Sequence, residues 1–546
     1  MKKSSVLYNK TIVVIERTWK PILLLIFGSN LLYFIFISYK YLAFNSDSAS
    51  KVLIASEILN SHSFFPKDWT YVNNDLWITT AHIFVVPLLQ FLPPGYLSHS
   101  IACSLMGGLI IFSIWWLVNA FQIVAAQKIL IILICLGGVS LTITESMFGQ
   151  VSYGTLLMFS VLLIKCLGLY DFNSAKKNLI YYFLTLLIVL LMVIGNPMRA
   201  VPYYLFPIAC SIIFLFICNC QQQRIRESVT RSLIFVGSLV IVCAAAFLIH
   251  KILVTHVNMQ QGVTTLRWIS LSEMLDKVPK LFASLITILG GEPYANRALS
   301  TTSGVYDGFR LLVALLFIGI LPRTLAFCLS SKDKLLQLTA VYALTSLIAL
   351  SVIMLGTSVF NARYLIPPVF LLVIAVAALP FKFRENIFFD IARLVVALGF
   401  CTNLFVINTS YWSTYHTSEI HKEDAQNFDH PSELAQLLLD NNLQYGFGTF
   451  WQANVVTVLT DNKVKTRPIY IENGRIFPMK WLSASSWYAE AAARGETFLI
   501  LSAAEALALN WDSFASVRGL TPFKTIQFKH YTVFIFSENI VAKLLR

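Results

Sequence analysis

Charged residues are scarce in this sequence: they make up 13% of its 546 residues, whereas an average soluble protein has about 25%. Apolar residues make up 57% of the chain. These two values exclude an ordinary soluble enzyme, and the aromatic content of 14% excludes a disordered chain, because disordered segments have few aromatic residues. The apolar residues lie in blocks of about 20, the length of a helix that crosses a bilayer. The composition therefore predicts a polytopic membrane protein.

Cysteine is absent from the last 145 residues, since Cys401 is the last of nine. All nine lie within or at the ends of apolar blocks, so a disulfide framework is excluded. The Cys218-Asn219-Cys220 run lacks the second pair of ligands that a structural zinc site needs. We interpret the cysteines as small apolar packing residues.

Polar breaks separate eleven apolar blocks, each of which we interpret as a transmembrane helix. They are residues 20–42, 97–121, 128–146, 151–170, 178–196, 200–219, 232–252, 306–329, 335–357, 363–380 and 388–408. With the N-terminus in the cytoplasm, the inside segments contain eighteen basic residues and six acidic ones, as the positive-inside rule requires. The net charge of +13 therefore reflects orientation in the bilayer, and we expect no nucleic-acid partner.

Two kinds of segment lie outside the membrane in this interpretation. Residues 1–409 form the membrane domain, and its loops 43–96 and 253–305 contain amphipathic patterns typical of helices at the outer membrane surface. Residues 410–546 are polar enough for a small extracytoplasmic α/β domain. A helix is predicted to begin at His430, and strands are predicted at 445–459, 466–471, 498–501 and 525–536.

Four ionisable side chains at outer ends of the spans are not explained by the positive-inside rule: Asp47, Glu145, Arg199 and Arg363. Charged residues near spans are costly and often functional. A guanidinium can pair with phosphate oxygens, and a carboxylate can take a proton from a hydroxyl. Simpler explanations also fit: Asp47 as a helix cap, the arginines as lipid anchors and Glu145 as a solvated loop residue.

Several motifs resemble those of the integral-membrane C-type glycosyltransferases (GT-C), in particular their bacterial envelope members. The runs that carry this resemblance are Asn45-Ser46-Asp47-Ser48-Ala49-Ser50 after the first span, Phe65-Pro66-Lys67-Asp68-Trp69 with Asp75-Leu76-Trp77, Ala362-Arg363-Tyr364-Leu365-Ile366-Pro367 before a late span, and Tyr445 to Asn454 with Trp481 and Ser486-Trp487-Tyr488. The many spans and the C-terminal outer domain agree with this family.

The resemblance implies an inverting transfer of sugar from a polyprenyl-phosphate donor to an envelope glycan such as O-antigen or lipopolysaccharide, at the outer face of the bacterial inner membrane. Asp47 would be the catalytic base and Glu145 its assistant. Arg199, Arg363, Lys67 and Arg267 would bind the donor phosphate. No Asp-x-Asp pair accompanies Asp47, so the sequence supports no definite metal site.

The same resemblance suggests acceptor-binding residues, because aromatic rings stack on sugars. These are Trp69, Asp75, Trp77, Trp481, Trp487 and Tyr488. The alternative for the tryptophans is a place in the core or in the interfacial aromatic belt. Two other functions stay open at this point: a transporter or flippase of lipid-linked sugars, which would place its polar groups near the bilayer midplane, and an envelope glycan ligase or polymerase.

Overall fold

The computed structural model describes residues 44–170, 179–219, 225–260, 266–293, 297–381, 386–414, 431–489, 495–512, 519–540 and 543. The chain divides into two compact units. Unit 1 holds the described residues between Ser104 and His250 and between Val263 and Ser413. Unit 2 holds those between Ile35 and Cys103, between Lys251 and Gly262, and from Thr414 to the C-terminus.

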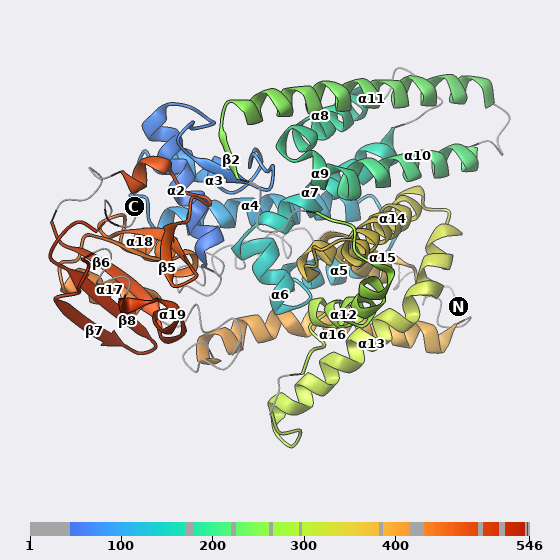
Figure 1. Cartoon of the computed structure of the whole chain (residues 1–546). Coiled ribbons are helices and arrows are strands. Elements are labelled where there is room, and N and C mark those ends of the chain that lie inside the picture. Colours follow the sequence, from blue (N-terminus) through green and yellow to red (C-terminus); the bar gives the residue numbers. More distant parts are fainter. Residues whose placement is uncertain are drawn as a thin grey trace. The chain divides into compact units, whose positions relative to one another are not determined.

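Long apolar helices dominate the membrane part of the chain (Figure 1). In the described ranges, seven segments are long and apolar enough to cross a bilayer: α4 (Tyr96–Val118), α7 (Ser152–Leu169), α9, η2 and α10 together (Pro197–Ile217), Thr230–Thr255 within α11 (Ile225–Thr255), α13 (Thr302–Leu329), α14 (Lys334–Gly356) and Ile387–Leu404 within α16 (Ile387–Thr414). Two shorter apolar segments are α8 (Leu179–Gly195) and η3 with α15 (Ala362–Leu365, Ile366–Ala378).

A broken segment completes the set. Helices α5 (Ala125–Gly137) and α6 with η1 (Leu141–Thr144, Glu145–Gly149) pass the same test together but meet at 80°. The ten blocks predicted after residue 96 coincide with these ten segments, which confirms the polytopic helical fold. The first predicted block, 20–42, lies outside the described residues.

The break between α5 and α6 corrects the prediction of one straight helix over 128–146. Gly138 ends α5 with a φ of +69°, a left-handed conformation that glycine adopts at little cost. Ser140 then caps α6, its hydroxyl accepting a hydrogen bond from Ile143 N at 3.2 Å. The chain turns here, so Glu145 lies on the second arm of the bend.

A buried arginine stabilises this bend within unit 1. Arg310 of α13 is only 3% exposed, and its guanidinium donates hydrogen bonds to Val139 O at 2.6 Å, Leu289 O at 2.7 Å and Gly399 O at 2.9 Å. These carbonyls belong to the bend, to the end of α12 (Leu271–Ile288) and to α16. Val139 and Leu289 lie just beyond helix ends, where carbonyls lack partners within their own helix, and Arg310 supplies a donor to both.

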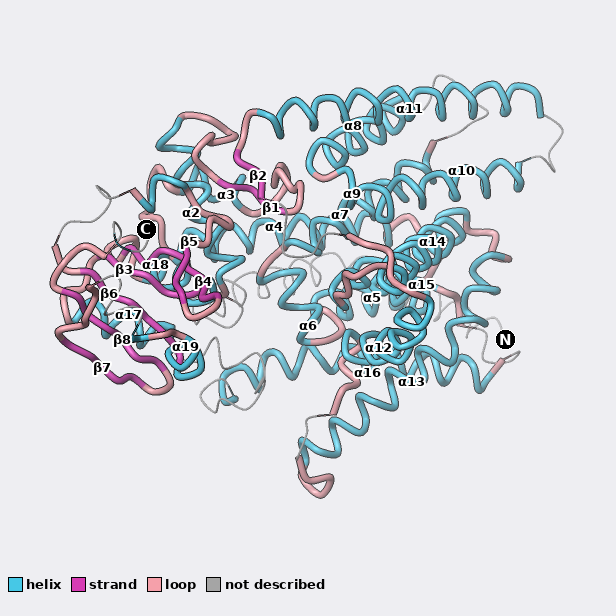
Figure 2. Tube along the Cα trace, viewed as in Figure 1, coloured by secondary structure: helices cyan, strands magenta, loops and turns pink. Residues whose placement is uncertain are grey.

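Unit 2 contains a six-stranded sheet in the order β5-β4-β3-β6-β8-β7, as Figure 2 shows. Strands β4, β3 and β6 are parallel, whereas β5 at one side and β8 and β7 at the other are antiparallel. The strands are β3 (Tyr445–Thr449), β4 (Lys465–Glu472), β5 (Arg475–Pro478), β6 (Thr497–Ser502), β7 (Lys524–Phe528) and β8 (Tyr531–Phe536). Helices α17 (Pro431–Asp440), α18 (Phe450–Leu459) and α19 (Ala503–Ala508) accompany them.

This arrangement confirms the predicted α/β fold at the C-terminus and corrects two of its elements. The strand expected over 445–459 ends at Thr449, and the rest is helix α18. Its Val-rich composition favours a strand, but the segment forms a helix that packs on β4, since tertiary packing overrides propensity. The strand expected over 525–536 is the hairpin of β7 and β8, turned at Lys529 with a φ of +53°.

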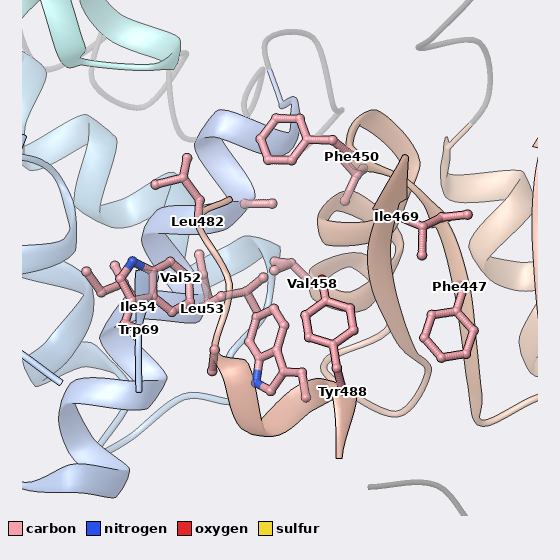
Figure 3. Close-up of a cluster of buried hydrophobic side chains, with 14 of the residues drawn as sticks. Val52, Leu53, Ile54, Trp69, Phe447, Phe450, Val458, Ile469, Leu482 and Tyr488 are labelled. Carbon is pink, nitrogen blue, oxygen red and sulfur yellow. The ribbon is translucent and has the colours of Figure 1, made fainter. Parts of the chain in front are cut away.

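The first loop and the C-terminal sheet share one hydrophobic core in unit 2. Figure 3 shows Val52, Leu53 and Ile54 of α2 (Ser46–Ser61) in one cluster with Phe450 and Leu482 from the C-terminal part. Ten of the sixteen residues of α2 are buried. The apolar side chains of this helix, which the surface prediction would place in lipid, therefore pack on protein.

The other elements of the two loops are smaller or more exposed. Strand β1 (Thr70–Val72) pairs in parallel with β2 (Asn258–Gln260), and the short α3 (His82–Leu88) packs on α2. In unit 1, α12 keeps the predicted amphipathic character: Leu271, Leu275 and Phe282 are all exposed.

We predict that Arg310→Ala lowers the free energy of unfolding by about 3 kcal/mol or more, because each buried carbonyl left without a donor costs roughly 1–3 kcal/mol. Arg323→Ala is the matched control: Arg323 is on the same helix, exposed, and bonded to Asn386 Oδ1 at 2.6 Å. Thermal unfolding of the detergent-solubilised protein measures both. Equal melting temperatures for the two variants would contradict the role given to Arg310.

Candidate active site

Asp47 lies in the first turn of α2, where the local sequence fixes both helix and carboxylate. Asn45 is the N-cap, and its side chain accepts a hydrogen bond from Ser48 N at 3.0 Å. Asp47 is half-buried, and its neighbours Ser46 and Ser48 are fully buried. A carboxylate in the first turn is favoured by the helix dipole. Asp47 is thus a partly accessible carboxylate at a helix end that is itself buried.

A buried polar seam joins this end of α2 to α18. Ser46 Oγ donates a hydrogen bond to Trp451 O at 3.0 Å, and Asn454 Nδ2 donates to Ser50 Oγ at 3.0 Å. Hydrogen bonds between buried groups are costly to leave unmade. The C-terminal domain therefore fixes the position of the helix that carries Asp47.

Lys51 lies one turn after Asp47 and is 1% exposed. Burial lowers its pKa, and nearby Cys103, Asp47 and Asp75 oppose this shift because they favour the charged ammonium. The sequence analysis missed Lys51. The sequence does contain a sign of its role, because Lys51 lies between Ala49 and Val52, among the apolar positions of an amphipathic pattern.

The other predicted residues of the first loop are partly brought together. Asp75 lies near Lys51, and its carboxylate accepts a hydrogen bond from Trp77 N at 3.1 Å; both residues are half-buried. The side chain of Lys67 is exposed, and its carbonyl oxygen accepts from Asn258 at 2.9 Å. Asp75 therefore belongs to the surroundings of Lys51, and Trp77 is bonded to Asp75.

Three predicted acceptor-binding residues lie in the core of unit 2. Trp69, Trp487 and Tyr488 are 0%, 7% and 3% exposed. The two indole rings meet edge to face with centroids 5.8 Å apart, and the guanidinium carbon of Arg467 lies 4.0 Å from the Trp487 ring. A sugar can stack only on an accessible ring face. We therefore correct their assignment from acceptor binding to core packing.

Trp481 differs from these three because it is half-buried. Its ring centroid lies 6.3 Å from that of Phe450, at the start of α18. It remains a candidate for acceptor binding together with Trp77.

Both arginines of unit 1 follow asparagine caps. Asn196 Oδ1 accepts a hydrogen bond from Arg199 N, and Asn361 Oδ1 accepts one from Arg363 N, each at 3.0 Å. The two segments are joined by Tyr203, whose hydroxyl donates to Tyr364 O at 2.8 Å. The structure therefore brings together the segments that carry Arg199 and Arg363, which are 164 positions apart in the chain.

Two further cations flank this pair of segments. The exposed Arg267 lies opposite Ser358, whose backbone N–H donates to Arg267 O at 2.8 Å. Lys277 of α12 donates to Thr357 O and lies 5.9 Å from the ring centroid of Phe360. The sequence analysis missed Lys277, although its position on a predicted amphipathic helix was visible. Unit 1 thus brings the chain segments of four cationic residues together around residues 357–364, and the Lys277 side chain contacts this segment.

Glu145 opens the π-helical turn η1 and is half-buried. Its carboxylate accepts a hydrogen bond from Gln150 Nε2 at 3.2 Å. Glu145 belongs to unit 1 and Asp47 to unit 2, so the two predicted catalytic carboxylates are held by separate cores. Over the described ranges, no three His, Cys, Asp or Glu side chains are grouped so as to hold a metal ion.

No protein-family model and no curated protein matches this sequence. The structure, however, is similar to that of ArnT from Cupriavidus metallidurans in the apo state: the TM-score is 0.53 at 12% identity, covering 94% of this chain and 97% of that one. ArnT of the same organism bound to undecaprenyl phosphate gives a TM-score of 0.49 at 11% identity over the same shares. ArnT is a GT-C glycosyltransferase, so the apo structure confirms the GT-C fold that the motifs predicted.

We predict that Trp69→Ala lowers the free energy of unfolding by about 3–5 kcal/mol, as removal of a buried aromatic ring does. Trp451→Ala, which removes a ring that is 36% exposed, is expected to have a much smaller effect. Thermal unfolding measures the difference. Wild-type stability in Trp69→Ala, combined with weaker acceptor binding, would restore the acceptor-binding role.

Proposed function

We propose that this chain is an inverting glycosyltransferase that moves a sugar from a polyprenyl-phosphate donor to a cell-envelope glycan, at the outer face of the inner membrane. O-antigen or another lipopolysaccharide glycan fits the resemblance noted above. The observation that carries the proposal is Asp47, a half-exposed carboxylate at the start of a helix held on both sides by buried contacts.

In the proposed reaction, the Asp47 carboxylate takes the proton of an acceptor hydroxyl. The hydroxyl oxygen attacks the anomeric carbon as the bond from that carbon to the phosphate oxygen breaks. Polyprenyl phosphate leaves with the electron pair, and attack from the opposite face inverts the anomeric centre. A base held rigidly in place is effective because the reacting atoms need close alignment.

The cations of unit 1 suit the leaving group. Negative charge grows on the phosphate oxygen as the bond breaks, and preorganised donors aimed at such charge lower the barrier. Within the described residues, the half-exposed Arg363 guanidinium has no recorded side-chain partner. We propose that Arg363 binds the donor phosphate, with Arg199, Arg267 and Lys277 as further candidates.

Arg310 gives no support to the alternative of a flippase. A transporter of anionic lipid-linked sugars would use charged groups within the spans to bind its cargo. Arg310 is the buried arginine in α13, but its guanidinium is occupied by the carbonyl oxygens of Val139, Leu289 and Gly399. It therefore serves the fold and is not free for a substrate.

We predict that Asp47→Asn leaves the protein folded but lowers sugar transfer about 10²–10⁴-fold, because the amide cannot act as a general base. Asp461→Asn, at an exposed turn of the same unit, is the matched control and is expected to keep full activity. The assay follows a labelled sugar from a polyprenyl-phosphate donor into envelope glycan in membranes. Wild-type transfer by Asp47→Asn would overturn the assignment of the base.

We predict that Arg363→Ala lowers the rate of transfer about 10²–10³-fold, the usual effect of losing one preorganised donor to a developing negative charge. Arg475→Ala, on β5 with an exposed side chain, is the control. Single-turnover rates with the same donor measure both. If Arg363→Ala transfers sugar at the wild-type rate, Arg363 is a lipid anchor and not a phosphate ligand.

A further inference from the structure

Lys51 is an ionisable side chain in the middle of a protein core, where burial lowers its pKa. It follows Asp47 by four residues, so both side chains lie on the same face of α2. Asp47 is half-exposed and Lys51 is 1% exposed, so the lysine lies beneath the aspartate. An ammonium at this depth cannot reach a substrate phosphate directly, and it is costly to bury unless anions face it.

The groups that face Lys51 come from four elements of unit 2. They are Asp47 on α2, Asp75 in the turn after β1, His82 at the start of α3, and Cys103 on α4. Ser50 and Asn454 on the α18 side of the helix carry no charge. Cys103, Asp47 and Asp75 all favour the charged form of Lys51, and the two aspartates are the carboxylates among them.

His82 can be excluded as the titrating partner. It is 1% exposed, and burial together with the charge of Lys51 lowers its pKa to about 3. Its Nδ1 forms a hydrogen bond with Thr80 Oγ1 at 2.7 Å. His82 is therefore neutral over the range in which an enzyme is assayed, and it contributes no charge that changes with pH there.

We propose that Lys51 is a positioning residue for the reaction: its ammonium, held between Asp47 and Asp75, keeps the Asp47 carboxylate ionised and oriented toward the acceptor. This inference rests on the proposed function, in which Asp47 is the base. A fixed positive charge one turn below a carboxylate favours its ionised form. Asp75 also interacts with the ammonium, and its negative charge weakens the preference of Asp47 for its ionised form.

The arrangement makes two opposite predictions for the pH dependence of transfer. A base works only when deprotonated, so kcat/KM rises with pH through the pKa of Asp47. Lys51→Met removes the positive charge, raises the pKa of Asp47 and moves this acid limb to higher pH by about one unit or more. Asp75→Asn removes the second carboxylate near Lys51, so the ammonium interacts with Asp47 only. This lowers the pKa of Asp47 and moves the acid limb of the kcat/KM profile to lower pH.

The experiment measures kcat/KM between pH 4.5 and 9 for the full-length enzyme in membranes, with Lys463→Met as the control because Lys463 is exposed in the same unit. We expect opposite displacements for Lys51→Met and Asp75→Asn, no displacement for the control, and a donor KM within about twofold of wild type for Lys51→Met. A one-unit displacement lowers kcat/KM about tenfold on the acid limb.

Each other outcome has a definite meaning. If Lys51→Met and Asp75→Asn keep the wild-type acid limb while activity falls, Lys51 only supports folding and the proposal is overturned. If Lys51→Met does not fold, Asp75→Asn decides alone, because its side chain keeps the oxygen that accepts from Trp77 N. If the wild type transfers no sugar, the proposed function has failed, which is distinct from an active enzyme with an unmoved limb.

Discussion

The hydrophobic core shared by the first loop and the C-terminal sheet is the constraint on which the rest of unit 2 depends. Burial of each large apolar side chain contributes roughly 1.5–3 kcal/mol, and α2 places Val52, Leu53 and Ile54 against residues about 400 positions later in the chain. Without the sheet, these side chains would face water. The C-terminal domain is therefore part of the scaffold that holds Asp47, and not an appendage to the membrane domain.

Buried polar groups then add directional precision to this apolar packing. Asn454 bonds Ser50 across the seam between α18 and α2, and Arg310 bonds carbonyl oxygens from three elements of unit 1. Apolar contacts are not directional, whereas a buried donor without its acceptor costs about as much as a lost hydrogen bond. The core sets which elements meet, and these polar contacts set their alignment.

Hydrophobic patterning predicted the ten apolar helical segments described after residue 96, because a bilayer demands apolar blocks of a definite length. It could not predict where α2 lies, since an amphipathic pattern looks the same whether its apolar face meets lipid or protein. The bend at Gly138 was not predicted for a related reason: the apolar residues on either side of it form one continuous apolar stretch in the sequence. Asp47 and Arg363 were found as charges at the outer ends of apolar blocks.

The burial of Trp69 and the position of Lys51 were not predictable in this way. Both depend on residues that approach from other parts of the chain: Trp487 contacts Trp69, and Asp75 approaches Lys51. Local sequence does record that Lys51 interrupts an apolar face. It does not record whether that lysine snorkels to the surface or is buried against carboxylates.

The kinds of cation in the two units follow from the chemistry each has to do. A guanidinium beside Asp47 would form a bidentate pair with both carboxylate oxygens and would compete with an acceptor hydroxyl for them. Lys51 is instead a compact point charge below the carboxylate, which favours ionisation and leaves an oxygen accessible. Arg363, in unit 1, presents a planar fork that matches a phosphate. If Asp47 is the base and Arg363 binds the donor phosphate, as proposed, a lysine below the carboxylate and an arginine for the phosphate each suit the role of their own unit.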